Sequence, residues 1–362
     1  MKKNLIIILI FIFMLILIPK VNASTDSASS YILMDETTGR VLLSKDMNSK
    51  RLIASITKIM TSTLAIESGK LDEVVEVDDT ISKAYGSGIY IEVGEEITLR
   101  DLLYGLMLRS GNDAASMIAK FVGGSEEEFV NMMNNKAKEL GMKNTIFYNA
   151  SGLPTPHGNY SSVYDMALLT RYAMQYKEYK EIVGTKKYKV TTNKKTYIWD
   201  NKNKLLKYDF ITGGKTGYTE ESGRTLVSTA TIDDMNLIAV TIRDSDDWNT
   251  HLELYNYAKD NYYAYRVLNK NKFKIYGENY YKDALFYIKN NIYIPLKKSE
   301  TKSLISHIKL DKKKNYHNNT VVGVDQIYLD KELIYEEDIY ITKNKNIAKE
   351  SILSKIKKWF HD

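Results

Sequence analysis

The sequence has no cysteine, only five histidines and a single long hydrophobic run. Without cysteine there can be no disulfide, thiolate zinc site, iron–sulfur cluster or cysteine nucleophile. The histidines lack metal-ligand spacing such as H-E-x-x-H, and no nucleotide-binding fingerprint occurs, so we expect neither a metal nor a cofactor. With 44% hydrophobic and 27% charged residues, the 362-residue chain is neither disordered nor a multi-span membrane protein. Its net charge of +6 is too small to indicate nucleic-acid binding.

The hydrophobic run lies near the start of the chain. It covers 14 residues from Leu5 to Ile18, follows two lysines and precedes a small-residue site that ends at Ala23. This arrangement is typical of a secretory signal peptide, and the run is shorter than the roughly 20 residues that a membrane-spanning helix needs. We therefore expect residues 1–23 to be a signal peptide and the protein to be exported. A retained N-terminal anchor is the alternative.

Hydrophobic periodicity predicts the secondary structure of residues 24–267. Apolar residues at helical spacing predict helices at 55–67, 99–108, 112–121, 126–140, 164–176 and 251–263. Runs rich in β-branched and aromatic residues predict strands at 31–34, 40–43, 187–191, 196–199, 225–230 and 235–242. Because strands and helices are segregated along the chain and do not alternate, the pattern predicts an α+β fold.

The composition changes near residue 268. Beyond it, short runs rich in tyrosine, isoleucine and valine alternate with clusters of lysine and asparagine, as at 292–294, 321–324, 326–329 and 338–341. This pattern predicts a small all-β domain over residues 268–345. Residues 271–362 contain 18 lysines and 12 acidic residues, whereas residues 24–270 are slightly acidic. The difference in charge supports a boundary between residues 267 and 268.

The first motif that indicates chemistry is S-x-x-K, formed by Ser55 and Lys58 at the start of a predicted helix. Residues three apart lie on one helical face, so the lysine amine can reach the serine hydroxyl. A serine is a weak nucleophile until a base activates it, and a desolvated lysine near another cation has a pKa low enough to act as that base. Taken alone, the motif also fits a capping serine followed by a solvated lysine.

Two further motifs follow in order. Ser110 and Asn112 form S-x-N in a break between two predicted helices, and Lys215, Thr216 and Gly217 form K-T-G at the entry to a predicted hairpin. The serine can relay a proton and the asparagine amide can bind a peptide group. The lysine supplies positive charge, the threonine a hydroxyl, and the glycine lets a substrate backbone approach the strand. Each motif alone is weak, but their ordered occurrence is specific.

These motifs resemble the active-site set of the penicillin-recognising serine acyltransferases. Within them, the sequences A-S-I-T-K-I-M-T, R-S-G-N-D-A-A and G-K-T-G-Y-T are similar to the low-molecular-mass penicillin-binding proteins that are D-alanyl-D-alanine carboxypeptidases. The resemblance covers residues 28–265. It implies a β-lactamase/transpeptidase-like domain, in which an antiparallel sheet packs on a helical block. Less specifically, the β-rich tail resembles the second domain of the two-domain members.

The resemblance also implies roles for the site residues. Ser55 would attack a peptidoglycan stem peptide ending in D-Ala-D-Ala, Lys58 would accept its proton, and Ser110 would pass a proton to the departing D-alanine. The substrate-binding residues would be Asn112, Lys215, Thr216, Gly217 and Tyr218, with the backbone N–H groups of Ser55 and Tyr218 forming the oxyanion hole. β-Lactam antibiotics would acylate Ser55.

One departure from the family concerns the substrate carboxylate. Many members have an arginine for it on the helix after the last strand pair, but residues 246–251 contain none here. Arg243 is close in sequence but is not assigned to the site. Carboxylate binding would then rest on Lys215 and Thr216. A second departure, Ile53 where members often have proline, would only alter the approach to the helix.

Two other functions stay open. One is a β-lactamase of the same superfamily, although these enzymes commonly have S-D-N where this chain has S-G-N. The other is a non-catalytic cell-wall or penicillin-binding module, although the intact motifs argue against a decayed site.

The end of the chain suggests a membrane partner. In residues 346–362, apolar residues fall on one helical face, and lysines lie mostly elsewhere; the apolar set is Ile352, Leu353, Ile356, Trp359 and Phe360. A basic amphipathic helix of this kind binds in the plane of an anionic membrane. We expect it to hold the protein on the outer face of the cytoplasmic membrane. A terminal helix docked on its own domain is the alternative.

Overall fold

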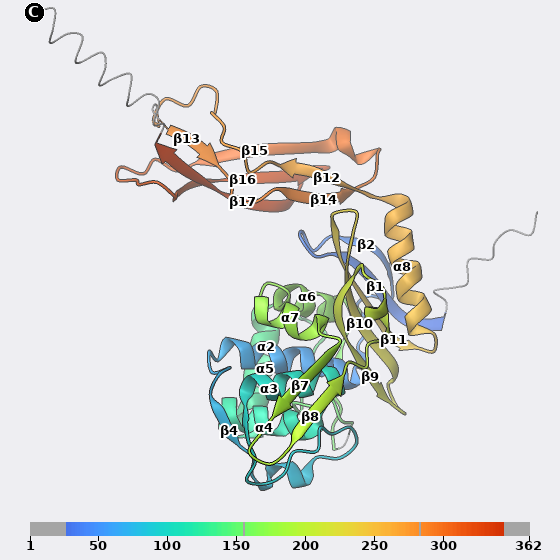
Figure 1. Cartoon of the computed structure of the whole chain (residues 1–362). Coiled ribbons are helices and arrows are strands. Elements are labelled where there is room, and N and C mark those ends of the chain that lie inside the picture. Colours follow the sequence, from blue (N-terminus) through green and yellow to red (C-terminus); the bar gives the residue numbers. More distant parts are fainter. Residues whose placement is uncertain (1–26, 155, 282–283, 344–362) are drawn as a thin grey trace, which may run out of the picture.

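A five-stranded antiparallel sheet forms the centre of the first of two units in the computed structural model, which describes residues 27–154, 156–281 and 284–343 (Figure 1). The strand order is β2-β1-β11-β10-β9, so β9 is an edge strand. The bounds are β1 (Ala28–Asp35), β2 (Val41–Lys45), β9 (Ile211–Thr219), β10 (Gly223–Ile232) and β11 (Met235–Asp244). The predicted hairpin of β10 and β11 is confirmed. Its turn residues Asp233 and Asp234 both have positive φ, as a tight hairpin requires.

The two faces of this sheet pack against different helices. Alternate residues of a strand point to opposite faces, so Leu226 and Val227 of β10 lie in separate hydrophobic cores. Leu226 packs with Leu254 and Tyr255 of α8 (Asp247–Asn261). Val227 belongs to the larger core, which the helical block fills. The sheet is therefore covered on both faces, and β9, which carries the K-T-G motif, is one of its two edge strands.

The helical block lies between the N-terminal hairpin and the later strands. Its helices are α2 (Lys58–Glu67), α3 (Leu99–Tyr104), α4 (Asn112–Gly123), α5 (Glu126–Glu139), α6 (Val163–Ala173) and α7 (Lys177–Gly184). Three short antiparallel strand pairs accompany them: β3 (Arg51–Leu52) with β6 (Tyr160–Ser161), β4 (Val74–Glu76) with β5 (Glu96–Thr98), and β7 (Lys187–Thr191) with β8 (Thr196–Asp200).

Several helix ends differ from the expected ones. The helix expected at 55–67 begins as a 3₁₀ turn, Ala54–Thr57, before α2. The helix expected at 99–108 changes after Tyr104 into a π-helical turn, which Ser110 ends in the left-handed conformation. Helix α8 begins at Asp247, four residues before the expected start, and α7 was not expected, since eight residues give little periodic signal.

The second unit contains only strands and one short 3₁₀ turn among its described residues, which agrees with the predicted all-β domain. A two-stranded sheet joins β12 (Tyr263–Leu268) to β14 (Ile292–Leu296). A four-stranded sheet has the order β13-β17-β16-β15, formed by β13 (Ala284–Tyr287), β15 (Leu304–Leu310), β16 (Thr320–Leu329) and β17 (Glu332–Lys343). The runs expected at 321–324 and 326–329 belong to one strand. The strand pairing groups β12 with this unit, although β12 begins five residues before the expected boundary at residue 268.

The two units meet at a short junction. Tyr262 alone separates α8 from β12. Arg40, in the turn after β1, donates a hydrogen bond of 3.1 Å to the carbonyl oxygen of Pro295 and forms an ion pair with Glu300. The hydroxyl of Tyr262 donates to the carbonyl oxygen of Leu42 at 3.2 Å. These contacts tie the second unit to the β1–β2 hairpin.

Both terminal segments that the sequence singles out, residues 1–23 and 346–362, lie outside the described residues. Within the described ranges, every helix is too short or too polar to cross a bilayer.

Candidate active site

Ser55 lies in the 3₁₀ turn Ala54–Thr57, at the entrance of α2. The backbone before it is strained, because Ala54 has a φ of +45°, a region that residues with a Cβ rarely adopt. Gly152 packs directly behind this turn. A Cβ on Gly152 would lie 1.9 Å from the carbonyl oxygen of Ala54, so only glycine fits there. The strain is therefore maintained by tight packing, and it fixes the position of the serine.

Lys58, the first residue of α2, lies beneath Ser55 and is fully buried. Its Nζ atom lies 3.0 Å from the Oγ atom of Ser55, as the S-x-x-K spacing predicts. It also donates to the Oδ1 atom of Asn112 at 2.8 Å and to the carbonyl oxygen of Ser151 at 2.5 Å. Three oxygen partners therefore hold the amine against the serine hydroxyl.

Burial and neighbouring cations change the basicity of this amine. Desolvation holds the pKa of Lys58 well below its ordinary value of 10.5, and the charges of Lys215 and Lys202 lower it further. A neutral lysine amine can accept the proton of a serine hydroxyl.

Ser110 and Asn112 lie where two helices meet. The π-helical turn Gly105–Arg109 ends at Ser110, whose φ of +65° and ψ of +36° are left-handed. Single π-turns of this kind occur frequently at functional sites. Asn112 begins α4, and its amide donates to the carbonyl oxygen of Tyr85 at 2.5 Å while its oxygen accepts from Lys58. The break between the helices thus turns both side chains toward Ser55.

Lys215 enters the site from β9. It is 1% exposed, and its Nζ atom donates to the Oγ atom of Ser110 at 3.1 Å and to the carbonyl oxygen of Thr216 at 2.6 Å. Burial, together with the charge of Lys202, lowers the pKa of Lys215 to about 7. Ser110 therefore has a proton donor or acceptor of nearly neutral pKa at hydrogen-bond distance.

Strand β9 runs directly against the turn that holds Ser55. A Cβ on Gly217 would lie 2.4 Å from the Oγ1 atom of Thr225 and 2.9 Å from the backbone nitrogen of Ser55. Glycine is thus required for the strand edge and the 3₁₀ turn to approach each other.

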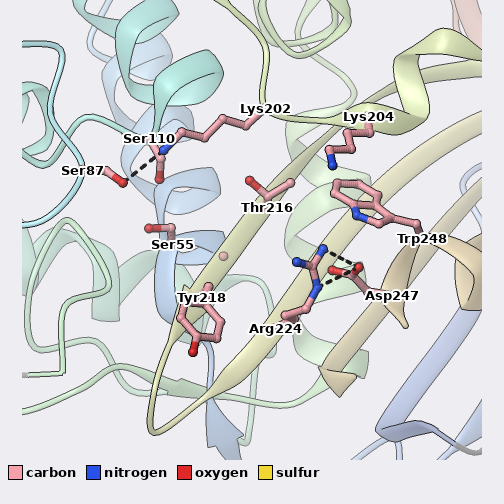
Figure 2. Close-up of a pocket in the computed structure, with 11 residues that line it drawn as sticks. Ser55, Ser87, Ser110, Lys202, Lys204, Thr216, Tyr218, Arg224, Asp247 and Trp248 are labelled. Atoms are coloured by element: carbon pink, nitrogen blue, oxygen red, sulfur yellow. Dashed lines mark hydrogen bonds and ion pairs between the residues drawn. The ribbon is translucent and has the colours of Figure 1, made fainter. Parts of the chain in front are cut away.

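Ser55 lies between two adjoining hollows of the surface. The first is a cleft of about 390 Å³, whose lining includes Ser55, Ser110, Thr216, Gly217 and Tyr218 (Figure 2). The second, of about 410 Å³, shares Ser55 and Tyr218 and is lined also by Asn112. Lys58 and Lys215 are buried and hydrogen-bonded to this lining. The structure therefore brings the other seven residues expected from the sequence together around Ser55.

The first cleft also contains residues that the sequence did not indicate, above all Arg224 and Asp247. Arg224 of β10 lies opposite Tyr218 of β9 in the strand register. It donates from Nε and Nη2 to the Oδ1 atom of Asp247, at 3.0 and 2.6 Å (Figure 2). Arg243, the arginine that the sequence could not assign, lines a different hollow and donates to the carbonyl oxygen of Glu221 at 3.3 Å. The hairpin register between β9 and β10 was the signal that could have found Arg224.

A second pair in this cleft, Lys202 and Ser87, was also not expected. The Nζ atom of Lys202 donates to the Oγ atom of Ser87 at 3.1 Å (Figure 2). Burial and the charge of Arg109 lower the pKa of Lys202. Both residues line the two hollows, so they frame the entrance to Ser55.

Solved structures share this architecture. Penicillin binding protein 5 from Haemophilus influenzae matches with a TM-score of 0.67 and 25% identity, over 88% of this chain and 97% of that one. The Streptomyces K15 DD-transpeptidase matches with a TM-score of 0.61 and 30% identity, over 64% of this chain and 97% of that one. The first likeness extends through the second unit. The predicted α+β fold with a small all-β domain is therefore confirmed.

Proteins of similar sequence belong to the same group as these structures. The D-alanyl-D-alanine carboxypeptidase DacF of Bacillus subtilis is 40% identical over 256 residues, which is 66% of each chain. DacC of Escherichia coli is 36% identical over 240 residues, or 63% of this chain and 59% of the relative. The chain thus spans somewhat less than two thirds of the length of these relatives. Residues 263–346 match the C-terminal domain of penicillin-binding protein 5. Residues 19–246 match the D-alanyl-D-alanine carboxypeptidase family, peptidase S11, and the chain belongs to that family.

Proposed function

We propose that this protein is a serine D,D-carboxypeptidase that removes the terminal D-alanine from peptidoglycan stem peptides, and that β-lactams acylate the same serine. The observation that carries the proposal is the contact between Ser55 and Lys58. A serine hydroxyl lies 3.0 Å from a buried amine whose pKa is held well below its ordinary value. This is the arrangement that acyl transfer by a serine requires.

In the acylation step, the Oγ atom of Ser55 forms a bond to the carbonyl carbon between the two D-alanines, and its proton passes to Lys58. The developing oxyanion is bound by the backbone N–H groups of Ser55 and Tyr218. Their proximity is supported by the close approach of β9 to the turn that contains Ser55. The C–N bond then breaks, and an ester to Ser55 remains.

The leaving D-alanine needs a proton on its amine nitrogen. Ser110 supplies it and recovers one from Lys215, whose Nζ atom is 3.1 Å away and whose pKa is about 7. Asn112 and Thr216 bind the peptide on either side of the scissile bond. Water then hydrolyses the ester: its hydroxyl group bonds to the acyl carbon, and its remaining proton returns to Lys215 through Ser110. The Oγ atom of Ser55 recovers its proton from Lys58, the shortened peptide leaves, and both lysines regain their starting protonation.

The composition of the two hollows disfavours the β-lactamase alternative. Fast hydrolysis of a β-lactam ester needs a base that activates water, and superfamily members use a further carboxylate for this. Among the described residues that line the hollows, the acidic side chain is Asp247, and its Oδ1 atom accepts two hydrogen bonds from Arg224. We therefore expect a long-lived penicillin adduct.

The test is to incubate the purified protein with a labelled penicillin and, separately, with diacetyl-Lys-D-Ala-D-Ala. A persistent adduct together with release of D-alanine supports the proposal. Rapid penicillin hydrolysis supports a β-lactamase. The absence of both reactions supports a non-catalytic binding module. The Ser55→Ala variant must lose the adduct, and labelling that persists in this variant would refute Ser55 as the nucleophile.

We further propose that the protein is exported and held on the outer face of the cytoplasmic membrane by residues 346–362. The support comes from the sequence, in which Trp359 and Phe360 extend the apolar face of a lysine-rich segment. The test compares the chain from Ser24 onward with a version that ends at residue 345, in sedimentation with vesicles containing phosphatidylglycerol. The longer chain should sediment and the shorter should not; equal binding of both would contradict the proposal. Sequencing of the exported protein should find Ser24 at its N-terminus.

A further inference from the structure

The carboxylate of a terminal D-alanine needs a cationic receptor on the leaving-group side of Ser55. The helix after the last strand pair has no arginine for this purpose. At the start of α8 the sequence has Asp247, whose charge would repel a carboxylate. The cleft nevertheless contains an arginine, Arg224, which comes from the neighbouring strand β10 and lines the same space as Ser55 and Thr216.

The hydrogen bonds of Arg224 leave one edge of its guanidinium available. A guanidinium has five N–H donors in a planar fork. Asp247 accepts one from Nε and one from Nη2, and both go to its Oδ1 atom. Among the described residues, the guanidinium of Arg224 has no other hydrogen-bond partner. Three N–H groups on Nη1 and Nη2 are thus free, and two of them form the parallel pair that binds a carboxylate bidentately.

Asp247 and Trp248 hold this fork in place. The side chain of Asp247 is 2% exposed, and its ion pair with Arg224 lies on the side of the guanidinium away from the free edge. The Cζ atom of Arg224 lies 5.4 Å from the centroid of the Trp248 ring, within cation–π distance. The arginine is therefore ordered before a ligand arrives, and binding costs little further side-chain entropy.

The other cations near the cleft are less suited to this role. Lys215 is buried and already donates to Ser110, and Lys202 donates to Ser87. Lys204 lines the cleft but is exposed, so its charge is more strongly screened. Arg243 lines a different hollow.

We propose that Arg224 binds the terminal carboxylate of the substrate, and the corresponding carboxylate of penicillins, with Asp247 as its positioning residue. The inference rests on the proposed function, because it names the group that selects a free C-terminal D-alanine. The carboxylate lies between the guanidinium fork and the hydroxyl of Thr216, and the scissile carbonyl faces Ser55.

The test measures kcat/KM for diacetyl-Lys-D-Ala-D-Ala and for the same peptide with an amidated C-terminus. The Arg224→Gln variant should lose about 100-fold on the free acid, which corresponds to one charge-assisted interaction, and almost nothing on the amide. The matched control, Arg243→Gln, should keep the wild-type preference for the acid. Acylation by benzylpenicillin and by its methyl ester should follow the same pattern.

The outcomes separate the two proposals. If the wild type releases no D-alanine and forms no adduct, the proposed function fails. If the wild type is active and Arg224→Gln keeps its kcat/KM and its acid preference, the function stands and the assignment of Arg224 is overturned. Arg224→Lys keeps the positive charge but lacks the two parallel N–H donors, so its loss of kcat/KM on the free acid should be smaller than that of Arg224→Gln. It replaces Arg224→Gln in the test if that variant does not fold.

The positioning role of Asp247 is tested by a measurement that a purely structural role would not change. Asp247→Asn should raise KM for the free acid more than it lowers kcat, and it should leave the amide unaffected. The double variant Arg224→Gln/Asp247→Asn should lose no more kcat/KM on the free acid than Arg224→Gln alone, because the aspartate acts through the arginine. Equal losses on acid and amide, or full additivity of the two substitutions, would overturn the positioning role.

Discussion

The Nζ atom of Lys58 and the Oδ1 atom of Asn112 lie 2.8 Å apart, in a hydrogen bond that joins the helix following the nucleophile to the helix following Ser110. The partner of the buried amine is a neutral amide, and desolvation therefore keeps the lysine pKa low. A carboxylate at the same position would stabilise the ammonium form. The choice of Asn or Asp at residue 112 therefore sets the pKa of Lys58 and, with it, the pH range in which Ser55 can be activated.

The first prediction concerns this pair. Asn112→Asp should raise the pKa of Lys58 by about one unit or more, because an opposite charge favours the protonated amine. Since the reaction needs the neutral amine, the acidic limb of the pH profile should move to higher pH by the same amount. The measurement is the rate of penicillin acylation between pH 5 and pH 10. A limb at its wild-type position would contradict the assignment of Lys58 as the base.

The second prediction concerns the stability cost of Lys215. Its pKa is about 7 in the folded protein and 10.5 ordinarily, so between these values the unfolded chain binds more protons than the folded one. Stability should therefore rise with pH in this window, by about 2–3 kcal/mol from pH 7 to pH 9. Lys215→Met should be more stable than wild type at pH 7, should show a smaller rise, and should lose about 100-fold or more in acylation rate.

Urea unfolding at the two pH values measures the stability, and labelled penicillin measures the acylation. The rise should be reduced in the variant but not abolished, because Lys58 has a lowered pKa as well. A wild-type stability that falls from pH 7 to pH 9 would contradict the prediction.

The third prediction tests the packing behind the nucleophile. Gly152→Ala and Gly141→Ala both add a methyl group at positive φ, but only the first meets backbone, 1.9 Å from the carbonyl oxygen of Ala54. Gly141→Ala should cost about 1 kcal/mol for the backbone conformation alone. Gly152→Ala should cost about 2 kcal/mol more and should slow acylation of Ser55, because the 3₁₀ turn must shift. Equal stability losses and equal acylation rates in the two variants would show that the turn tolerates displacement.

The fourth prediction concerns the junction between the units. Arg40→Ala removes the ion pair with Glu300 and the hydrogen bond to Pro295. Because the pair is partly exposed, the global stability should fall by about 1 kcal/mol or less. The radius of gyration from small-angle scattering should increase, and cleavage near Tyr262 by chymotrypsin should accelerate, while the rate of penicillin acylation stays unchanged. A slower acylation would mean that the junction influences the active site.

The sequence alone predicts the contacts that depend on local periodicity or on family motifs. The spacing of Ser55 and Lys58 on one helix predicts their contact, and the resemblance to known enzymes predicts that Ser110, Asn112 and Lys215 join them. The segregation of strands and helices likewise predicts the α+β fold.

Long-range geometry accounts for what the sequence did not indicate. The position of Arg224 follows from the register of β10 with β9, but its partner Asp247 comes from another element and has no local signal. The left-handed Ala54 depends on Gly152, which is distant in sequence. The π-helical turn before Ser110 interrupts a stretch whose apolar pattern predicts an ordinary helix.

Helix α8 begins with the carboxylate that holds Arg224 and ends one residue before the first strand of the second unit. Its 15 residues form a rod of about 22 Å, packed along the sheet that contains the K-T-G strand. One helix therefore connects the end of the cleft that contains Arg224 to the β-rich unit. A rotation of the second unit that tilts this helix would therefore displace Asp247 and, through its ion pair, the side chain of Arg224.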